Sequence, residues 1–138
     1  MDSKPPRPTK RLLFVCVENS CRSQMAEAFT RMLGGDDVEA WSAGSRPSGV
    51  VNPKAIAAMD AVGYDLRTHR SIGLDDLPPV EFDLAVTMGC GDACPNVVAR
   101  ARADWAVAQP KDMGPAEFAA VRDEIRDRVQ ALLDESAS

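Results

Sequence analysis

The chain has 138 residues, enough for one domain with a single hydrophobic core and too few for two. Its 45% hydrophobic and 27% charged residues are typical of a globular protein, and no apolar run approaches the roughly 18 residues that span a bilayer. A formal net charge of −5 argues against nucleic acid as a partner, because phosphate backbones are bound by excess lysine and arginine. The opening residues lack the apolar stretch of a secretory signal, so we expect a cytoplasmic protein without a membrane partner.

The N-terminal half predicts two strand and helix pairs after a tail. Residues 1–10 contain three prolines and no apolar period, which predicts a flexible tail before a single domain over 11–138. The short, continuously apolar run over 12–17 is typical of a strand buried on both faces of a parallel sheet. Residues 23–33 have helical apolar spacing that ends at a glycine pair. A second strand is predicted over 38–43, and a second helix over 53–62 with Asn52 as its N-cap.

The C-terminal half continues this alternation. The apolar run over 82–88 predicts a third strand, and a short fourth strand is expected at 104–107. From Pro115 onward one apolar stripe predicts a long amphipathic helix, and its residues are Phe118, Val121, Ile125, Val129 and Leu132. Strands that alternate with helices predict an α/β fold with a mainly parallel sheet.

A cysteine ends the first predicted strand, and an arginine follows six positions later where a helix begins: these are Cys16 and Arg22. The amides of such a loop can point inward and bind a tetrahedral oxyanion, and the helix N-terminus adds positive partial charge. The arginine can hold two of the oxygens, and the same field favours the thiolate form of the cysteine, which is a nucleophile. We therefore expect the anion to be bound by Val17, Glu18, Asn19, Ser20, Cys21 and Arg22.

Residues around the loop have supporting roles in this interpretation. Ser23 can donate a hydrogen bond to the Cys16 thiolate, and Asn19 can brace the loop because asparagine tolerates left-handed backbone geometry. The carboxylate of Glu18 would oppose an anion that it faced, so we expect it to point outward. The single histidine, His69, has no partner suggested by spacing, and a surface or capping role is expected.

The four cysteines form two pairs that are far apart in the sequence, Cys16 with Cys21 and Cys90 with Cys94. In a cytoplasmic protein such cysteines are more often reactive or metal-bound than joined in structural disulfides. A redox relay and a four-cysteine zinc module are both open, although zinc sites usually have tighter spacings and the loop arginine would repel a cation. Cys21 lies inside the loop, where a small packing residue is more common than a second nucleophile.

Taken together, these segments resemble arsenate reductases built on the low-molecular-weight tyrosine phosphatase fold. The resemblance is carried by FVCVENSCRSQMAEAF, WSAGSRPSGVVNPKAIAAMDAVGYDL and DLAVTMGCGDACP, and it covers the chain from Arg11 to about Leu133. It implies a four-stranded parallel sheet flanked by helices, arsenate as substrate, thioredoxin or another thiol reductant as partner, and no cofactor. The second cysteine pair favours reduction, because two thiols supply two electrons when they form a disulfide. A low-molecular-weight tyrosine phosphatase is the alternative enzyme.

The resemblance also implies an order of events at the cysteines. Cys16 attacks arsenate and forms a covalent adduct. Cys90 then attacks Cys16, so that arsenite leaves as a disulfide forms. Cys94 finally attacks Cys90, which moves the disulfide outward and frees Cys16 for another turnover.

The sequence departs from the family pattern at the general acid and at a potassium site. Relatives carry an aspartate before a proline as the general acid, but here Gln109 precedes Pro110, and glutamine cannot donate a proton as an acid. Asp112 is the preferred substitute because it lies beside this proline, and Asp104 is the second choice. Some relatives also hold a potassium ion, but Ile72 occupies the aspartate position of that site, so we expect no metal. The other three positions match, in Asn19, Glu27 and Ser42.

Overall fold

The computed structural model describes residues 10–35, 38–88 and 99–137. Within these residues the strands form one parallel sheet in the order β2-β1-β3-β4. Their bounds are β1 (Lys10–Cys16), β2 (Val38–Gly44), β3 (Phe82–Thr87) and β4 (Ala99–Asp104). Because β1 lies inside the sheet, its last residue, Cys16, is placed at the middle of the carboxyl edge, with Gly44 as its register partner in β2. The predicted four-stranded α/β architecture is confirmed.

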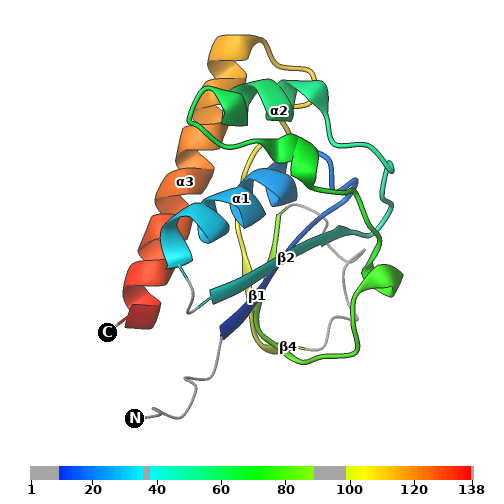
Figure 1. Ribbon diagram of the computed structural model, residues 1–138, viewed down its shortest axis with the longest axis vertical. Helices are drawn as coiled ribbons and strands as arrows, with labels where there is room; N and C mark the ends of the chain where they lie inside the picture. The colour runs from blue at the N-terminus through cyan, green and yellow to red at the C-terminus, as the bar shows by residue number, and fades with distance from the viewer. Residues whose placement is uncertain (1–9, 36–37, 89–98, 138) are drawn as a thin grey trace, which may run out of the picture.

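Three helices pack together on one side of this sheet. They are α1 (Arg22–Gly34), α2 (Pro53–Asp60) and α3 (Pro115–Ala137), and Figure 1 shows them gathered on the same side. The opposite face packs against the segment 72–80, which includes the 3-10 turn η3 (Leu74–Asp76). A second 3-10 turn, η2 (Leu66–Thr68), follows α2. In the part of the chain described here, no helix is both long and apolar enough to cross a membrane.

The central strand β1 is buried on both faces, as its apolar run predicts. Leu12 and Phe14 belong to the core cluster beneath the helices, whereas Leu13 and Val15 belong to the cluster beneath the segment 72–80. Burying side chains of this size contributes roughly 1.5–3 kcal/mol each relative to exposure. The strand that ends in Cys16 is therefore anchored from both sides, and the position of the cysteine is fixed by the core.

The fourth strand differs from the prediction. It runs over Ala99–Asp104, so the expectation of a strand at 104–107 is wrong. This strand is an edge strand with the sequence ARARAD, which alternates alanine with charged residues and has no apolar run to mark it. The apolar residues that suggested a strand, Trp105 and Val107, instead form the connection that leaves the sheet, and Val107 is buried there.

The remaining elements agree with the predicted ones within two residues. Asn52 caps α2 as expected, since its Oδ1 accepts a hydrogen bond from the amide of Lys54 at 2.8 Å. In α3 the last core position is taken by Leu133 rather than by the predicted Leu132, which is only partly buried. Leu133 lies four residues after Val129 and continues the buried stripe of the helix.

Candidate active site

The loop between β1 and α1 is held by its carbonyl groups. Four of them accept hydrogen bonds from amides of the segment 45–52: Cys16 O from Ser45 N (3.2 Å), Val17 O from Arg46 N (2.8 Å), Glu18 O from Ser48 N (3.0 Å) and Ser20 O from Asn52 N (3.0 Å). Among the residues that the structure describes, no amide of residues 18–21 donates a hydrogen bond. The loop therefore turns its acceptors toward the neighbouring segment and leaves a run of donors for a ligand.

Asn19 fixes the unusual backbone of this loop. Its φ of 52° lies in the left-handed region, and its side chain is completely buried. The Oδ1 atom accepts from the amide of Ile72 at 2.8 Å and from Gln24 Nε2 at 3.0 Å, while Nδ2 donates to Ser23 Oγ at 2.8 Å. Each polar atom of this amide has a partner, as a buried polar group requires, and the predicted bracing role agrees with these contacts.

The end of β2 passes unusually close to the same loop. A Cβ atom added to Gly44 would lie 2.5 Å from the carbonyl oxygen of Val17 and 2.9 Å from the amide nitrogen of Asn19. Both atoms belong to the backbone and cannot move aside as a flexible side chain could. Glycine at this position is therefore a steric requirement of the loop.

Cys16 lies at the base of the loop and is 1% exposed. Its Sγ atom is 2.9 Å from Ser23 Oγ, as the sequence suggested. Because Ser23 Oγ already accepts a hydrogen bond from Asn19, its own hydrogen is free to be donated to the sulfur. This hydrogen bond and the N-terminus of α1 both place positive partial charge beside the sulfur.

Cys21 is as buried as Cys16, at 1% exposed, and both residues belong to the core cluster beneath the helices. The two thiols differ in their partners, because the Sγ atom of Cys21 accepts from Ser20 Oγ at 3.8 Å, and burial raises the pKa of Cys21. A raised pKa favours the neutral thiol, which is a poorer nucleophile than a thiolate. The packing function that the sequence suggests for Cys21 stays a prediction.

Arg22 connects the loop to the segment after β4. The side chain is 4% exposed, and one of its terminal nitrogens donates to the carbonyl oxygen of Val107 at 3.1 Å. Its Nε atom is buried and has no acceptor in the described part of the chain. Leaving a buried donor unpaired costs about 1–3 kcal/mol, and more for a charged group, which an oxyanion bound in the loop would offset.

The carboxylate of Glu18 forms an ion pair with Lys111. The lysine Nζ lies 3.0 Å from Oε2 and 3.3 Å from Oε1, and both side chains are partly exposed. The hydrogen bond to Glu18 and then the charge of that carboxylate raise the pKa of Lys111. A second part of the anion loop is therefore attached to the segment that follows β4.

A buried network behind the loop was not predicted from the sequence. The side chain of His69 is 5% exposed, so the expected surface role is wrong, although the residue does cap η2 through its amide. Its Nδ1 lies 2.9 Å from Gln24 Oε1, and its Nε2 lies 2.6 Å from the hydroxyl of Tyr64. Burial lowers the pKa of His69, and the neutral ring satisfies both contacts by donating from Nδ1 and accepting at Nε2. Gln24 in turn donates to Asn19.

The residues at the potassium position of some relatives do not fit an ion in this chain. The carboxylate of Glu27 contacts Arg31 at 2.8 Å and accepts from Ser42 at 2.6 Å. The side-chain oxygen of Asn19 is already used by two donors, one of which is the amide of Ile72.

The two candidate acids are placed differently. Asp104 Oδ1 accepts from Thr87 Oγ1 at 2.7 Å, so this carboxylate belongs to the edge of the sheet. Asp112 is exposed in the turn that follows Pro110, and among the described residues no hydrogen bond joins it to Cys16. Neither carboxylate is brought to the sulfur by a contact of the described residues.

The second cysteine pair, Cys90 and Cys94, lies outside the described residues. The nearest described residue before it is Met88, whose amide donates to the carbonyl oxygen of Val15 at 2.8 Å. Met88 therefore lies beside Val15, the residue directly before Cys16 at the end of β1.

A buried cysteine bonded to a serine, a buried arginine and unpaired amides at the carboxyl edge of a parallel sheet are typical of thiol enzymes that bind oxyanions. Residues 11–137 match the family described as low molecular weight phosphotyrosine protein phosphatase, and the chain belongs to this family. Within it the chain is similar to arsenate reductase 2 of Staphylococcus saprophyticus, with 39% identity over 129 residues, 91% of this chain and 97% of the relative. The resemblance inferred from the sequence is confirmed.

Two solved structures extend this comparison. One, described as an arsenate reductase in the phosphate binding state, has a TM-score of 0.84 and 34% identity, and the match covers 92% of this chain and 98% of that one. The other is a thioredoxin-dependent arsenate reductase of Corynebacterium glutamicum, with a TM-score of 0.75 and 28% identity over 93% of this chain and 62% of that one.

Proposed function

We propose that the chain is a cytoplasmic arsenate reductase, which binds arsenate in the loop 16–22 and reduces it to arsenite for arsenical resistance. The observation that carries this proposal is the buried pair of Cys16 and Arg22 on a loop with unpaired amides. The relatives support arsenate as the substrate, because they are named arsenate reductases and the match covers almost their full length.

Binding requires donors that match a tetrahedral oxyanion. The amides of residues 18–21 and the unpaired Nε of Arg22 are such donors. Arsenate and phosphate share shape and charge, so the phosphate-binding structure of a relative supports an oxyanion site of this kind. The loop is held by hydrogen bonds before the ligand arrives, which limits the reorganisation needed on binding.

The reduction of arsenate uses three thiols in turn, those of Cys16, Cys90 and Cys94. The Cys16 thiolate attacks arsenic and a hydroxyl leaves as water, which forms a sulfur–arsenic bond. Cys90 then attacks Cys16, a disulfide forms, and the electron pair of the broken sulfur–arsenic bond stays on arsenic, which leaves as arsenite. Cys94 attacks Cys90, so that the outer disulfide forms and Cys16 is released as a thiolate. Thioredoxin or another thiol reductant then reduces the Cys90–Cys94 bond. A relative that is described as thioredoxin-dependent supports this partner.

The departing hydroxyl needs a proton, but Gln109 occupies the position at which relatives carry the aspartate that donates it. We assign this role to Asp112, which lies three residues after Gln109 on the exposed segment before α3. The same replacement weakens the alternative of a phosphatase, because an aryl-oxide leaving group needs its proton more than an arsenate hydroxyl does.

The decisive experiment is a single turnover of the fully reduced protein with one equivalent of arsenate and no reductant. Thiol mapping by mass spectrometry should find a Cys90–Cys94 disulfide and a free Cys16. The variant Cys94→Ser should stop one step earlier, with Cys16 bonded to Cys90. A Cys16–Cys21 disulfide, or normal cycling of Cys94→Ser with thioredoxin, would contradict the relay.

Two further assays separate the alternatives. Hydrolysis of an aryl phosphate that exceeds arsenate turnover would favour the phosphatase. Stoichiometric zinc in protein purified under reducing conditions would favour the four-cysteine module. Offering thioredoxin, glutaredoxin and a low-molecular-weight thiol separately would identify the reductant.

A further inference from the structure

A glutamate within an anion-binding loop is an electrostatic obstacle. The carboxylate of Glu18 belongs to the same short loop whose amides would bind the oxyanion. Two negative charges held on one short loop repel each other. In the structure this charge is met directly by the ammonium group of Lys111, through contacts of 3.0 and 3.3 Å. The lysine comes from 93 residues later in the chain, on the segment before α3.

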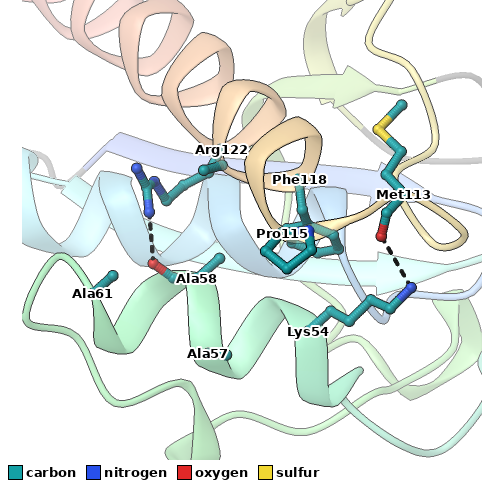
Figure 2. Close-up of a pocket in the computed structure, with 9 residues that line it drawn as sticks. Lys54, Ala57, Ala58, Ala61, Met113, Pro115, Phe118 and Arg122 are labelled. Atoms are coloured by element: carbon teal, nitrogen blue, oxygen red, sulfur yellow. Dashed lines mark hydrogen bonds between the residues drawn. The ribbon is translucent and has the colours of Figure 1, made fainter.

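The position of Lys111 is set by a second lysine. Lys54, in the first turn of α2, donates from Nζ to the carbonyl oxygens of Lys111 at 2.9 Å and Met113 at 3.1 Å, and Figure 2 shows the bond to Met113. The amide of Met113 closes a turn by donating to Pro110 O at 2.9 Å. The backbone that carries Lys111 is therefore fixed to α2, while its side chain reaches the anion loop.

We infer that Lys111 is a specificity-determining residue of the anion site, which neutralises Glu18 and thereby allows the loop to bind a multiply charged oxyanion. The inference rests on the proposed function of this loop, and it concerns the side chains of Lys111 and Glu18, since Glu18 offers the anion only its backbone amide.

The pair acts on binding more than on stability. Exposed ion pairs contribute little to folding, because the charges are screened and the side chains lose freedom. An unpaired carboxylate close to a bound anion has a larger effect on affinity. For a doubly charged anion about 6–12 Å from the carboxylate, Coulomb's law with the permittivity of water gives a weakening of roughly three- to tenfold.

The test is a double-mutant cycle with Lys111→Met, Glu18→Gln and both together. KM for arsenate and Kd for inorganic phosphate, measured by calorimetry, should rise three- to tenfold in Lys111→Met, whereas kcat should stay within about twofold. Glu18→Gln should bind at least as tightly as the wild type, and the double variant should regain the affinity of Glu18→Gln. Arg100→Met is the matched control, because it breaks an exposed pair with Glu81 at the amino end of β4 and should leave both constants unchanged.

Salt separates neutralisation from a structural role. The Debye length falls from about 10 Å at 0.1 M salt to about 3 Å at 1 M, so the defect of Lys111→Met should shrink as sodium chloride is added. A defect that persists in the double variant, or that is independent of salt, would overturn the inference. Phosphate binding without arsenate turnover in the wild type would instead count against the proposed reductase, and the phosphate measurements would still test Lys111.

Discussion

The anion loop and the segment 107–114 meet at the same site but are built in opposite ways. In the loop, Asn19 and Ser23 are completely buried, and their side chains bond to each other. In the segment, Gln109, Lys111 and Asp112 are exposed. The segment is joined to the loop through the contact of Arg22 with Val107 and the ion pair of Lys111.

Substitutions in the two regions should therefore have unequal costs. Substitution inside the loop disturbs several buried hydrogen bonds at once, whereas substitution on the exposed segment alters charge or proton transfer at little cost in stability. The replacement of the usual acid by Gln109 and the lysine that meets Glu18 both fall on this segment. The loop thus provides the chemistry, and the segment adjusts it.

The largest effect should come from the nucleophile. Cys16→Ser should abolish arsenate reduction, because serine is neither a thiolate nor a source of electrons, while the thermal midpoint stays close to that of the wild type. Cys21→Ser is the matched variant in the same loop. It should keep measurable turnover, since its amide remains in place, and should unfold more easily because a hydroxyl replaces a buried thiol. Thioredoxin-coupled NADPH consumption measures both, and substantial turnover by Cys16→Ser would refute its role.

The residue that joins the two regions should come next. Arg22→Lys keeps the charge but loses the planar guanidinium, which both donates to Val107 and presents Nε to the anion. We expect kcat/KM for arsenate to fall by roughly 10²–10³, as for the loss of a transition-state donor. Arg67→Lys, in an exposed pair with Asp60, is the control and should keep normal kinetics. Wild-type kinetics in Arg22→Lys would mean that charge alone holds the anion.

A smaller effect is expected within the exposed segment. Asp112→Asn should lower kcat by up to about tenfold, below the usual range for a well-placed general acid, because this carboxylate is solvated. Asp104→Asn should have less effect on turnover, since Asp104 is bonded to Thr87 at the edge of the sheet. Steady-state rates at several pH values compare the two. Equal and near-normal rates would show that water or the substrate supplies the proton.

The smallest effect should be a pH dependence of stability from the network behind the loop. The pKa of His69 is lowered by burial, so below about pH 6.5 the unfolded chain takes up a proton that the folded chain resists. Stability is therefore complete above this value and is lost as the pH falls through the folded-state pKa. In urea titrations the wild type should lose more stability from pH 7 to pH 5 than His69→Gln does. Parallel profiles would show that His69 does not titrate in this range.

Features built from consecutive residues could be predicted from the sequence, whereas contacts between residues far apart in the chain could not. The loop from Cys16 to Ser23 could be interpreted because its donors, nucleophile and flanking strand and helix are consecutive residues. β4 was misplaced because an edge strand of alternating alanine and charge has no apolar signal. The contacts between Gln24 and His69 and between Glu18 and Lys111 span 45 and 93 residues, and no spacing rule connects such positions. They arise only when the sheet and helices are assembled.

The close approach of Gly44 has a consequence for protein design. The oxyanion loop cannot be transferred to another protein by itself, because its shape depends on a glycine in the adjacent strand. Any other residue there would place a carbon 2.5 Å from the carbonyl oxygen of Val17. It also depends on the amides of the segment 45–52, which bind the loop from outside. A designer who grafts residues 16–23 onto another parallel sheet must therefore transfer the end of the neighbouring strand and its following segment with it.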